Sequence, residues 1–559
     1  MTEASHSPDY APKGARSGRK GGTGVFVALG WLVALACVLP MLAVALAAAV
    51  GGTDTITHLA ATVLPRYTGT TVVLVALVSL GTLLVGVGAA WLVTMTYFPG
   101  VRLFEIALVL PLAFPAYVLA YAYTFILDHP GIVQTTLRQV TGWGPRDYWF
   151  PEIRSTGGAA VMLVLVLYPY VYLLARAAFM QQSAGAFLAA RALGKSAWEA
   201  FWRVSLPMAR PAIASGVLLA VMETIADFGT VSYFGVQTFA TGIYTSWFSL
   251  ADRAGAAQLA LCLLSFALML AVVERSTRGK ARYHQAGKHH AEMPPAELTG
   301  TRAVAAWVLC AIPVAFGFLL PVVILFNMGL QSEQDLLSRR YVGFIQNSLI
   351  LASVAAMLTV LAAVTLGFYQ RLRPGRGSST AAYMSRLGYA VPGGVIAVGL
   401  MVPFAAFDNA LDAWMRATFD IRTGLLITGS IWLLVAAYMV RFLAAALGAY
   451  ESGQATVHVN MDAAARSLGQ SPLGMLRRVH LPILTPSLLT ALLIVFVDVM
   501  KELPATLIMR PFNYDTLAVQ AYRLASDERL EGAAVPSLVI VAVGLLPVVL
   551  ICRQVGRRR

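Results

Sequence analysis

Two stretches of the chain carry closely similar sequences: AARALGKSAWEAFWRVSLPMARP at residues 189–211 and AARSLGQSPLGMLRRVHLPILTP at residues 464–486. They align without gaps at an offset of 275 residues (469 − 194), and about half of the aligned positions are identical. Similarity between two distant stretches of one chain indicates an internal repeat. The fold is therefore expected to contain two copies of one structural unit.

Each copy carries the signals of two short helices around a turn. Gly194 and Gly469 follow helical runs, where a glycine in the left-handed conformation commonly ends a helix. Ser196 and Glu199 then have the spacing of a capping box, and Ser471 is placed to cap the corresponding helix of the second copy. We therefore expect a helix, a tight turn and a second helix in each copy.

A Leu-Pro pair is expected to close the second helix of each copy. These pairs are Leu206 with Pro207 and Leu481 with Pro482. The next apolar runs are then expected to begin at Pro211 and Pro486.

The composition places the chain in a membrane. Of its 559 residues, 58% are hydrophobic and 12% are charged, whereas about 25% are charged in ordinary soluble domains. The apolar residues recur along the whole length, which excludes a soluble enzyme and predicts the bilayer as solvent. The net charge of +14 lies in short basic clusters between apolar runs. Such clusters suit lipid headgroups and helix orientation better than nucleic acid.

Twelve stretches have the length and apolar character of a membrane span, which needs about 20 residues. They lie near residues 25–49, 70–96, 103–127, 157–180, 211–232, 256–274, 303–328, 346–369, 382–407, 422–447, 484–506 and 536–552. Lys and Arg are more frequent in the loops on the side of the N-terminal tail, which predicts that both termini are cytoplasmic. We therefore expect an all-α polytopic membrane protein.

The repeat divides the spans into two halves of six. Because six is even, the halves must have the same orientation and be related by an axis along the membrane normal. We predict a cytoplasmic tail at 1–24, a first repeat at 25–274, a polar, basic cytoplasmic linker at 275–302, a second repeat at 303–552 and a basic tail at 553–559.

The repeated stretches resemble the cytoplasmic loop of permease subunits of bacterial ABC importers. That loop has the pattern E-A-A-x-x-x-G, followed nine residues later by I-x-L-P. The residues that match it or lie within it are Ala189, Ala190, Arg191, Gly194, Val204, Leu206 and Pro207 in the first copy, and Ala464, Ala465, Arg466, Gly469, Val479, Leu481 and Pro482 in the second. The leading Glu is replaced by Leu188 and by Ala463, with Asp462 one position earlier.

The resemblance implies a multi-pass permease subunit in a bacterial inner membrane. Two copies of a separate ABC ATPase would dock on the two loops, and a periplasmic binding protein would deliver the substrate. ATP and Mg²⁺ would belong to the ATPase, so this chain is expected to hold no cofactor, to bind no nucleic acid and to catalyse no covalent reaction. The Gly-Lys-Ser run at Gly194 lacks the upstream glycine of a P-loop, since position 189 is Ala.

The cargo is indicated by two further stretches. Residues 221–248 and 498–526 look like the corresponding regions of fused ferric-iron importer permeases, which implies ferric iron as the substrate. Fused permeases for thiamine have the same layout, so thiamine or another small solute is the alternative. A secondary transporter with two parallel halves is the alternative from another class.

Four acidic residues within the predicted spans stand at matched positions. Glu223 and Asp227 are four residues apart, and adding 275 gives Asp498 and Glu502. Each pair would share one helix face, and ionisable residues at such depth usually face a bundle interior or a water-filled path. One hypothesis is that they line a pathway for a multivalent cation without forming a stable metal site. The alternative is that Lys501 neutralises Asp498 or Glu502 and the other carboxylates link helices structurally.

Other residue types carry weaker signals. His284, His289 and His290 lie in the basic linker, where a metal site is not expected. Pro115 and Pro392 occupy similar places in the two halves and are expected to kink spans three and nine. The tyrosines of spans three and four are expected to pack, and the four cysteines, which lack C-x-x-C spacing, to act as small hydrophobes.

Overall fold

The computed structural model describes residues 21–182, 190, 192–279, 296–335 and 338–556. Within this part, eleven helices are long and apolar enough to cross a membrane, and a bent pair of helices makes twelve if it is counted as one span. The predicted all-α polytopic fold is confirmed. Many large apolar side chains on these helices are exposed in the isolated chain, such as Leu32 and Leu46 on the first helix, with 62% and 67% exposure. These surfaces are suited to contact lipid.

The first half contains twelve described helices. They are α1 (Gly21–Val50), α2 (Gly52–Thr62), α3 (Leu64–Met95), α4 (Val101–Ala107), α5 (Ala116–Leu127), α6 (Ile132–Thr141), α7 (Thr156–Gln181), α9 (Ala197–Ala200), α10 (Leu206–Ala226), α11 (Gly229–Tyr233), α12 (Phe239–Tyr244) and α13 (Arg253–Gly279). Short 3₁₀ or π-helical turns are η1 (Leu110–Ala113), η2 (Phe201–Ser205) and η3 (Thr245–Ser249).

The second half has a parallel set of described elements. Its helices are α14 (Gly300–Val314), α15 (Leu320–Gln331), α16 (Arg339–Leu372), α17 (Arg376–Leu387), α18 (Gly393–Phe419), α19 (Ile431–Gln454), α20 (Val459–Ser467), α21 (Pro472–Met475), α22 (Leu481–Met500), α23 (Pro504–Met509), α24 (Leu517–Ser526) and α25 (Leu530–Gly556). Its short turns are η4 (Ala315–Leu319), η5 (Gly388–Ala390) and η6 (Leu476–His480).

The third span of each half is broken at its proline. Pro115 is the N-cap residue of α5 and Pro392 is the N-cap residue of α18. The residues before them, Phe114 and Val391, have extended backbone conformations with ψ of 131° and 98°, as expected before proline. In the first half the two helical parts meet at 91°. The bends expected at these prolines are therefore complete breaks, and each proline starts a new helix.

The predicted helix ends at the Leu-Pro pairs are also wrong. In each copy of the repeat the backbone passes through a π-helical turn, η2 or η6, directly into α10 or α22. Pro211 and Pro486 therefore lie inside these helices. Leu206 donates its N–H to Phe201 O across the first π turn. Pro207 then lies at the start of α10, directly after the π turn. The widened turn accommodates the proline without ending the helix.

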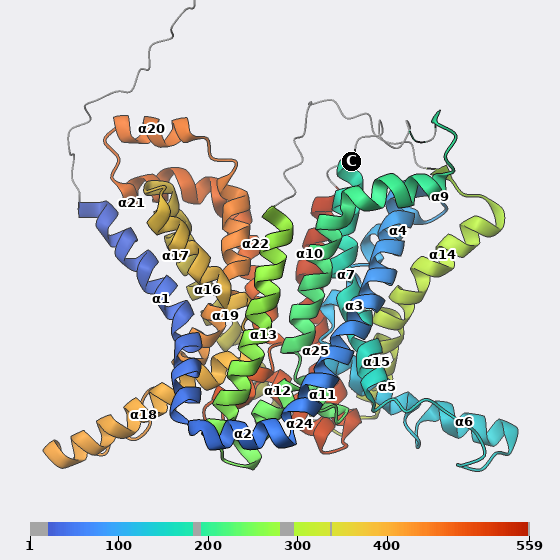
Figure 1. Ribbon diagram of the computed structural model, residues 1–559, viewed down its shortest axis with the longest axis horizontal. Helices are drawn as coiled ribbons and strands as arrows, with labels where there is room; N and C mark the ends of the chain where they lie inside the picture. Colours follow the sequence, from blue (N-terminus) through green and yellow to red (C-terminus); the bar gives the residue numbers. More distant parts are fainter. Residues whose placement is uncertain (1–20, 183–189, 191, 280–295, 336–337, 557–559) are drawn as a thin grey trace, which may run out of the picture.

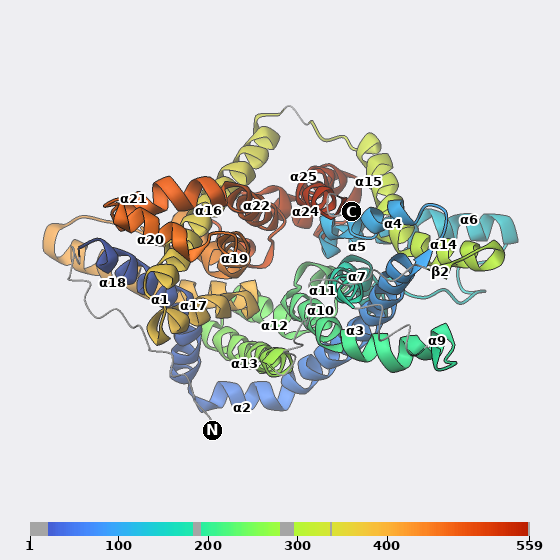
Figure 2. The ribbon, with the colours of Figure 1, turned by 90° about the horizontal axis from the view of Figure 1, so that it is seen from above.

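The first span of each half packs against the other half. Helix α1 contacts α16, α17 and α18, with α13 as its main first-half neighbour. Helix α14 in turn contacts α3 and α4, and the rings of Phe104 and Trp307 meet edge to face at 5.7 Å. Figures 1 and 2 show this exchange, with α1 beside α16, α17 and α18, and α14 beside α3 and α4. The repeat is a unit of sequence, whereas the packing intertwines the two copies.

The helices that flank the predicted linker extend into it at both ends. Helix α13 continues to Gly279 and α14 begins at Gly300. Between them, Ala296 and Glu297 form a two-residue strand, β2 (Ala296–Glu297), which pairs in parallel with β1 (Thr96–Tyr97) after α3. The linker histidines lie outside the described residues.

The short helices that connect the long ones gather at two opposite ends of the molecule (Figure 1). The short helices of the repeated stretches, α9, α20 and α21, lie at one end, which we call the loop end. Helices α2, α6, α12 and α24 lie at the other, which we call the far end. The described chain starts with α1 and finishes with α25 at the loop end.

Candidate functional site

A cavity of about 150 Å³ lies between the two halves and is lined by all four predicted carboxylates. Glu223 and Asp227 come from α10 and its end, and Asp498 and Glu502 come from α22 and the residues after it. The other walls are formed by α5 and α7 of the first half and by α19 and η5 of the second. Figure 2 shows α5, α7, α10, α19 and α22 around the centre of the molecule.

The outer member of each acidic pair caps a short helix. Asp227 Oδ1 accepts hydrogen bonds from the N–H groups of Thr230 and the following residue, both at 3.1 Å, and Oδ2 accepts from Thr230 Oγ1 at 3.1 Å. In the second half, Glu502 Oε1 accepts from Ala505 N at 2.9 Å, and Oε2 accepts from Thr506 Oγ1 at 2.6 Å. These two carboxylates therefore hold the starts of α11 and α23.

This capping corrects the expected geometry of the pairs. Helix α10 ends at Ala226 and α22 ends at Met500, so Asp227 and Glu502 lie beyond the helices that carry their partners. The members of a pair do not share one continuous helix face. The helix ends bring them to the same cavity nonetheless.

The inner member of each pair has a lighter set of contacts. Glu223 Oε1 accepts a long hydrogen bond of 3.4 Å from Tyr389 Oη. Lys501 Nζ lies 2.9 Å from Asp498 Oδ1, and the two side chains are 27% and 28% exposed. Lys501 thus neutralises Asp498, one of the two carboxylates considered for it. Glu223 is the carboxylate of the four that has no ion pair and no capping role among the described contacts.

Arg441 of α19 also lines the cavity and was not predicted from the sequence. Its Nη1 has no hydrogen-bond partner among the described residues. A Cβ built on Gly393 would touch both this guanidinium and Glu502 Oε1, so the two charged groups lie beside each other. The repeat gives no hint of it, because position 166 in the first half is Val. The available signal was a lone arginine within an apolar span.

The cavity is therefore acidic but mixed in charge. Four carboxylates face two fixed cations, Lys501 and Arg441, and three tyrosines, Tyr117, Tyr170 and Tyr389, complete the polar lining. No group of three or more His, Cys, Asp or Glu side chains within the described residues is arranged to hold a metal ion.

Contacts between the halves join them at the far end. Arg154, which precedes α7, makes two hydrogen bonds to Glu528 between α24 and α25, at 2.7 and 2.8 Å. Its Nε also donates to Asp128 Oδ2 at 3.0 Å. The Arg154 guanidinium lies 5.1 Å from the centre of the Tyr233 ring, and Tyr233 ends the helix that Asp227 caps. We call the Arg154–Glu528 ion pair the far-end latch.

The two repeated loops turn as the sequence predicts. Gly194 and Gly469 have φ of +80° and +73°, the left-handed region that favours glycine. The residue after each glycine donates its N–H to the carbonyl of Ala190 or Ala465, at 3.1 and 3.0 Å. The left-handed conformation predicted at both glycines is confirmed, and at Gly469 it follows the end of α20.

The helix starts in these loops are also confirmed. Ser196 N donates to Glu199 Oε2 and Glu199 N donates to Ser196 Oγ, both at 3.1 Å, which completes the capping box. The hydrogen bond from the Ser196 backbone, with Lys195 nearby, holds the pKa of Glu199 below its usual value. In the second copy Ser471 Oγ accepts from Gly474 N at 3.1 Å.

The remaining loop residues that the sequence singled out have varied positions. On α20, Ala464 is exposed and the following Ala465 is buried. Arg466 Nε donates a hydrogen bond to the Asp462 carbonyl at 3.1 Å. Leucines before the two glycines are 81% and 78% exposed. The Leu-Pro pairs begin α10 and α22. Ala189 and Arg191 lie outside the described residues.

Comparison with known proteins agrees with these features. Residues 82–279 match the model of a family described as "Binding-protein-dependent transport system inner membrane component". The chain is 26% identical over 539 residues to the Fe(3+)-transport system permease protein FbpB 2 of Haemophilus influenzae, which covers 93% of this chain and 96% of that protein. It is 24% identical to the ferric transport system permease protein FbpB of Actinobacillus pleuropneumoniae, over 79% of this chain and 64% of that protein. The molybdenum transport system permease protein ModB of Escherichia coli is 28% identical over 33% of this chain and 80% of its own length.

Proposed function

Because the chain is a fused, two-repeat permease of the binding-protein-dependent ABC transporter type, we propose that it is the membrane subunit of an importer for ferric iron. The observation that carries the proposal is the cavity between the halves, to which each half contributes two carboxylates from matched positions. The names of the two ferric relatives support the same cargo. Another relative, 31% identical over 26% of this chain, is named as a probable sulfate transport system permease protein, and sulfate is an anion that the acidic lining of this cavity would repel.

The proposed pathway runs from the far end through the cavity to the loop end. Carboxylate oxygens are hard ligands suited to a multivalent cation. Lys501 acts as a tethered counter-ion that neutralises Asp498 while no cargo is present, and a passing cation displaces it. Because Asp227 and Glu502 are held by backbone N–H groups, Glu223 and Asp498 are the carboxylates that are freer to meet the cargo.

The proposed orientation puts the loop end in the cytoplasm and the far end in the periplasm. Two ABC ATPase subunits would dock at the loop end, one on the loop around Gly194 and one on the loop around Gly469. They would hold the ATP and Mg²⁺, and this chain would contribute no catalytic residue. A periplasmic binding protein would deliver iron at the far end, and closure of the ATPases would switch access between the two ends.

Uptake of radiolabelled ferric iron tests the proposal, with labelled thiamine measured in parallel. Cells that lack the gene should recover ATP-dependent iron uptake when the gene is restored. Glu223→Gln should lower that uptake without loss of the protein from the membrane, since its described contact is one long hydrogen bond. Glu199→Gln is the matched control, because Gln retains the capping-box geometry at an exposed site. Restored thiamine uptake with unchanged iron uptake would refute ferric iron as the cargo.

A further inference from the structure

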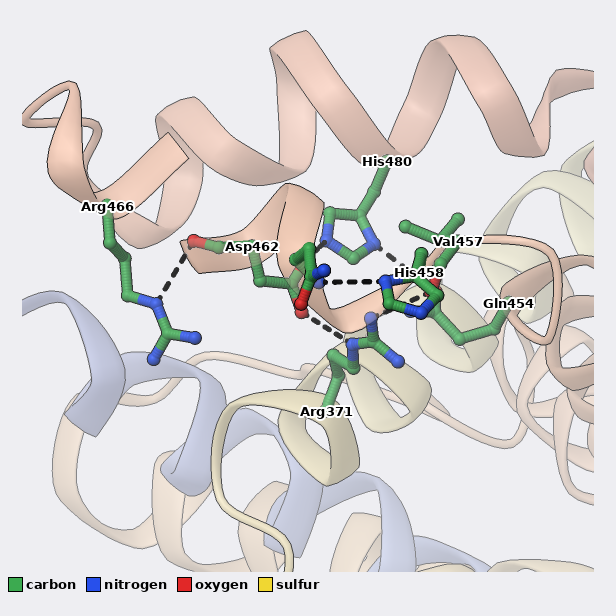
Figure 3. Close-up of polar contacts among 8 residues, drawn as sticks. Arg371, Gln454, Val457, His458, Asp462, Arg466 and His480 are labelled. Atoms are coloured by element: carbon green, nitrogen blue, oxygen red, sulfur yellow. Dashed lines mark hydrogen bonds and ion pairs between the residues drawn. The ribbon is translucent and has the colours of Figure 1, made fainter. Parts of the chain in front are cut away.

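Asp462, the carboxylate of the second repeated loop, faces inward and not toward a docking partner. It lies on α20 and is 4% exposed. Its Oδ2 accepts a hydrogen bond of 2.6 Å from Arg371 Nε, and its Oδ1 lies 2.9 Å from His480 Nε2 (Figure 3). Both carboxylate oxygens are thereby engaged by side chains of the same polypeptide.

The groups around Asp462 come from four different segments. Arg371 ends α16 and also donates to the carbonyl of Val457, in the loop before α20, at 2.8 Å. His480 ends the π turn before α22, is fully buried, and places Nδ1 at 3.3 Å from Gln454 Oε1 at the end of α19. Figure 3 shows Arg371 of α16 and His480 of η6 beside Asp462. We call Asp462, Arg371 and His480 the loop tether.

Helix α20 also exposes apolar side chains. Val459 and Met461 are 60% and 42% exposed, and Leu468 at its end is 78% exposed. With Asp462 buried, contact to an ATPase at this loop would rest on these apolar side chains. The Asp462 carboxylate instead binds Arg371 and His480 within the chain.

The first half cannot build the same tether. Position 187, which is 275 before Asp462, is Phe, and position 205, which is 275 before His480, is Ser. The buried contact beside the first loop is aromatic: the Phe201 ring of η2 lies 4.4 Å from Trp91, which in turn lies 5.6 Å from Phe179. The two halves therefore fix their loops to the spans by different chemistry.

We propose that the loop tether transmits movement of the second loop to the cavity. This inference rests on the proposed function, in which an ATPase moves the loop. His480 directly precedes α22, whose far part carries Asp498, about 27 Å away along a continuous helix at 1.5 Å per residue. Asp462, Arg371 and His480 are thus positioning residues. A movement of α20 shifts α16 and α22 together, because the charged tether resists separation in a buried setting.

The test uses the complete transporter with its ATPase subunits, reconstituted in vesicles. Asp462→Asn should leave the amount of bound ATPase and the basal rate of ATP hydrolysis within about twofold of wild type, yet lower uptake per ATP hydrolysed on the order of tenfold. Asp462→Glu, which keeps the charge, should recover most of the loss. Arg371→Gln combined with Asp462→Asn should cost little more than either change alone, because the residues act as one unit.

Two results would overturn the tether. One is wild-type uptake per ATP in Asp462→Asn and Arg371→Gln. The other is loss of the ATPase subunit from Asp462→Asn, since that would make the carboxylate a direct docking contact.

A second readout separates the tether from the choice of cargo. A cysteine placed at Ala226, in the cavity wall, should change its rate of thiol labelling when ATP is added, whatever solute is carried. Asp462→Asn should abolish that ATP-dependent change. If the wild-type complex shows the ATP-dependent change in labelling rate but does not transport iron, ferric iron is refuted as the cargo and the tether is not. If Asp462→Asn shows the same ATP-dependent change in labelling rate as wild type, the tether is refuted.

Discussion

Glu528→Gln should open the far end of the cavity more often. The change removes the charge from a carboxylate that receives two hydrogen bonds from Arg154, at 2.7 and 2.8 Å, and that joins the second half to the first. Because Arg154 makes two hydrogen bonds to one carboxylate, the free energy that this ion pair contributes should lie in the upper part of the range for ion pairs. Screening by solvent lowers this free energy, since the side chains of Glu528 and Arg154 are 60% and 28% exposed. We therefore expect a loss of about 1 kcal/mol, or about a fivefold rise in the open population.

The labelling rate of Ala226→Cys by a membrane-impermeant thiol reagent added at the far side measures this population. The rate should rise about fivefold when Glu528→Gln is added, if opening is fast and limits access. Asp527→Asn, one residue away and without a described ion pair to Arg154, is the matched control and should leave the rate unchanged. The chain without the new cysteine reports labelling of native cysteines. Equal rates in the two variants would refute the latch.

Three further predictions concern charge and backbone. Arg154 holds the pKa of Glu528 below its usual value of 4.5, so the latch should stay formed at higher pH and weaken only as pH falls through that lowered pKa. Because the thiol itself reacts more slowly as pH falls, the readout is the ratio of the Ala226→Cys labelling rates with and without Glu528→Gln, which should be constant from about pH 8 to 5. Gly469→Ala should cost the second loop about 1 kcal/mol, because φ is +73°, and Gly469→Asn less; thermal melting and ATPase copurification report both. Lys501→Met should leave Asp498 unpaired, so that iron is held longer in the cavity and leaves more slowly, measured by single-turnover release; unchanged release would contradict the counter-ion role.

The sequence predicted the span count and the loop geometry because both depend on local patterns. Apolar length alone marks a span, and the glycines at 194 and 469 mark the left-handed turns. The breaks at Pro115 and Pro392 were underestimated as kinks. A proline signals the loss of one helical hydrogen bond, but whether the helix bends or restarts depends on the neighbouring helices. The same applies to the Leu-Pro pairs, where a π turn keeps the helix continuous.

For the candidate site, the repeat was the informative signal. Matched positions indicated that four carboxylates meet, and the cavity brings them together. The capping roles of Asp227 and Glu502 were missed because they follow from where α10 and α22 end, which the apolar pattern does not determine. Arg441 and the tether residue Arg371 were missed for another reason: both belong to one half only, so comparison of the halves cannot find them.

The exchange of first spans has a consequence for biosynthesis. Helix α1 is complete at residue 50, but its partner α18 ends at residue 419, which is 369 residues later (419 − 50). At ordinary ribosomal speed that interval lasts roughly 20 to 70 s. During this time α1 is in the bilayer with lipid, and later α13, in place of α16, α17 and α18. Release of the nascent chain at the linker would therefore leave the first half with an exposed helix surface and no native neighbour to cover it.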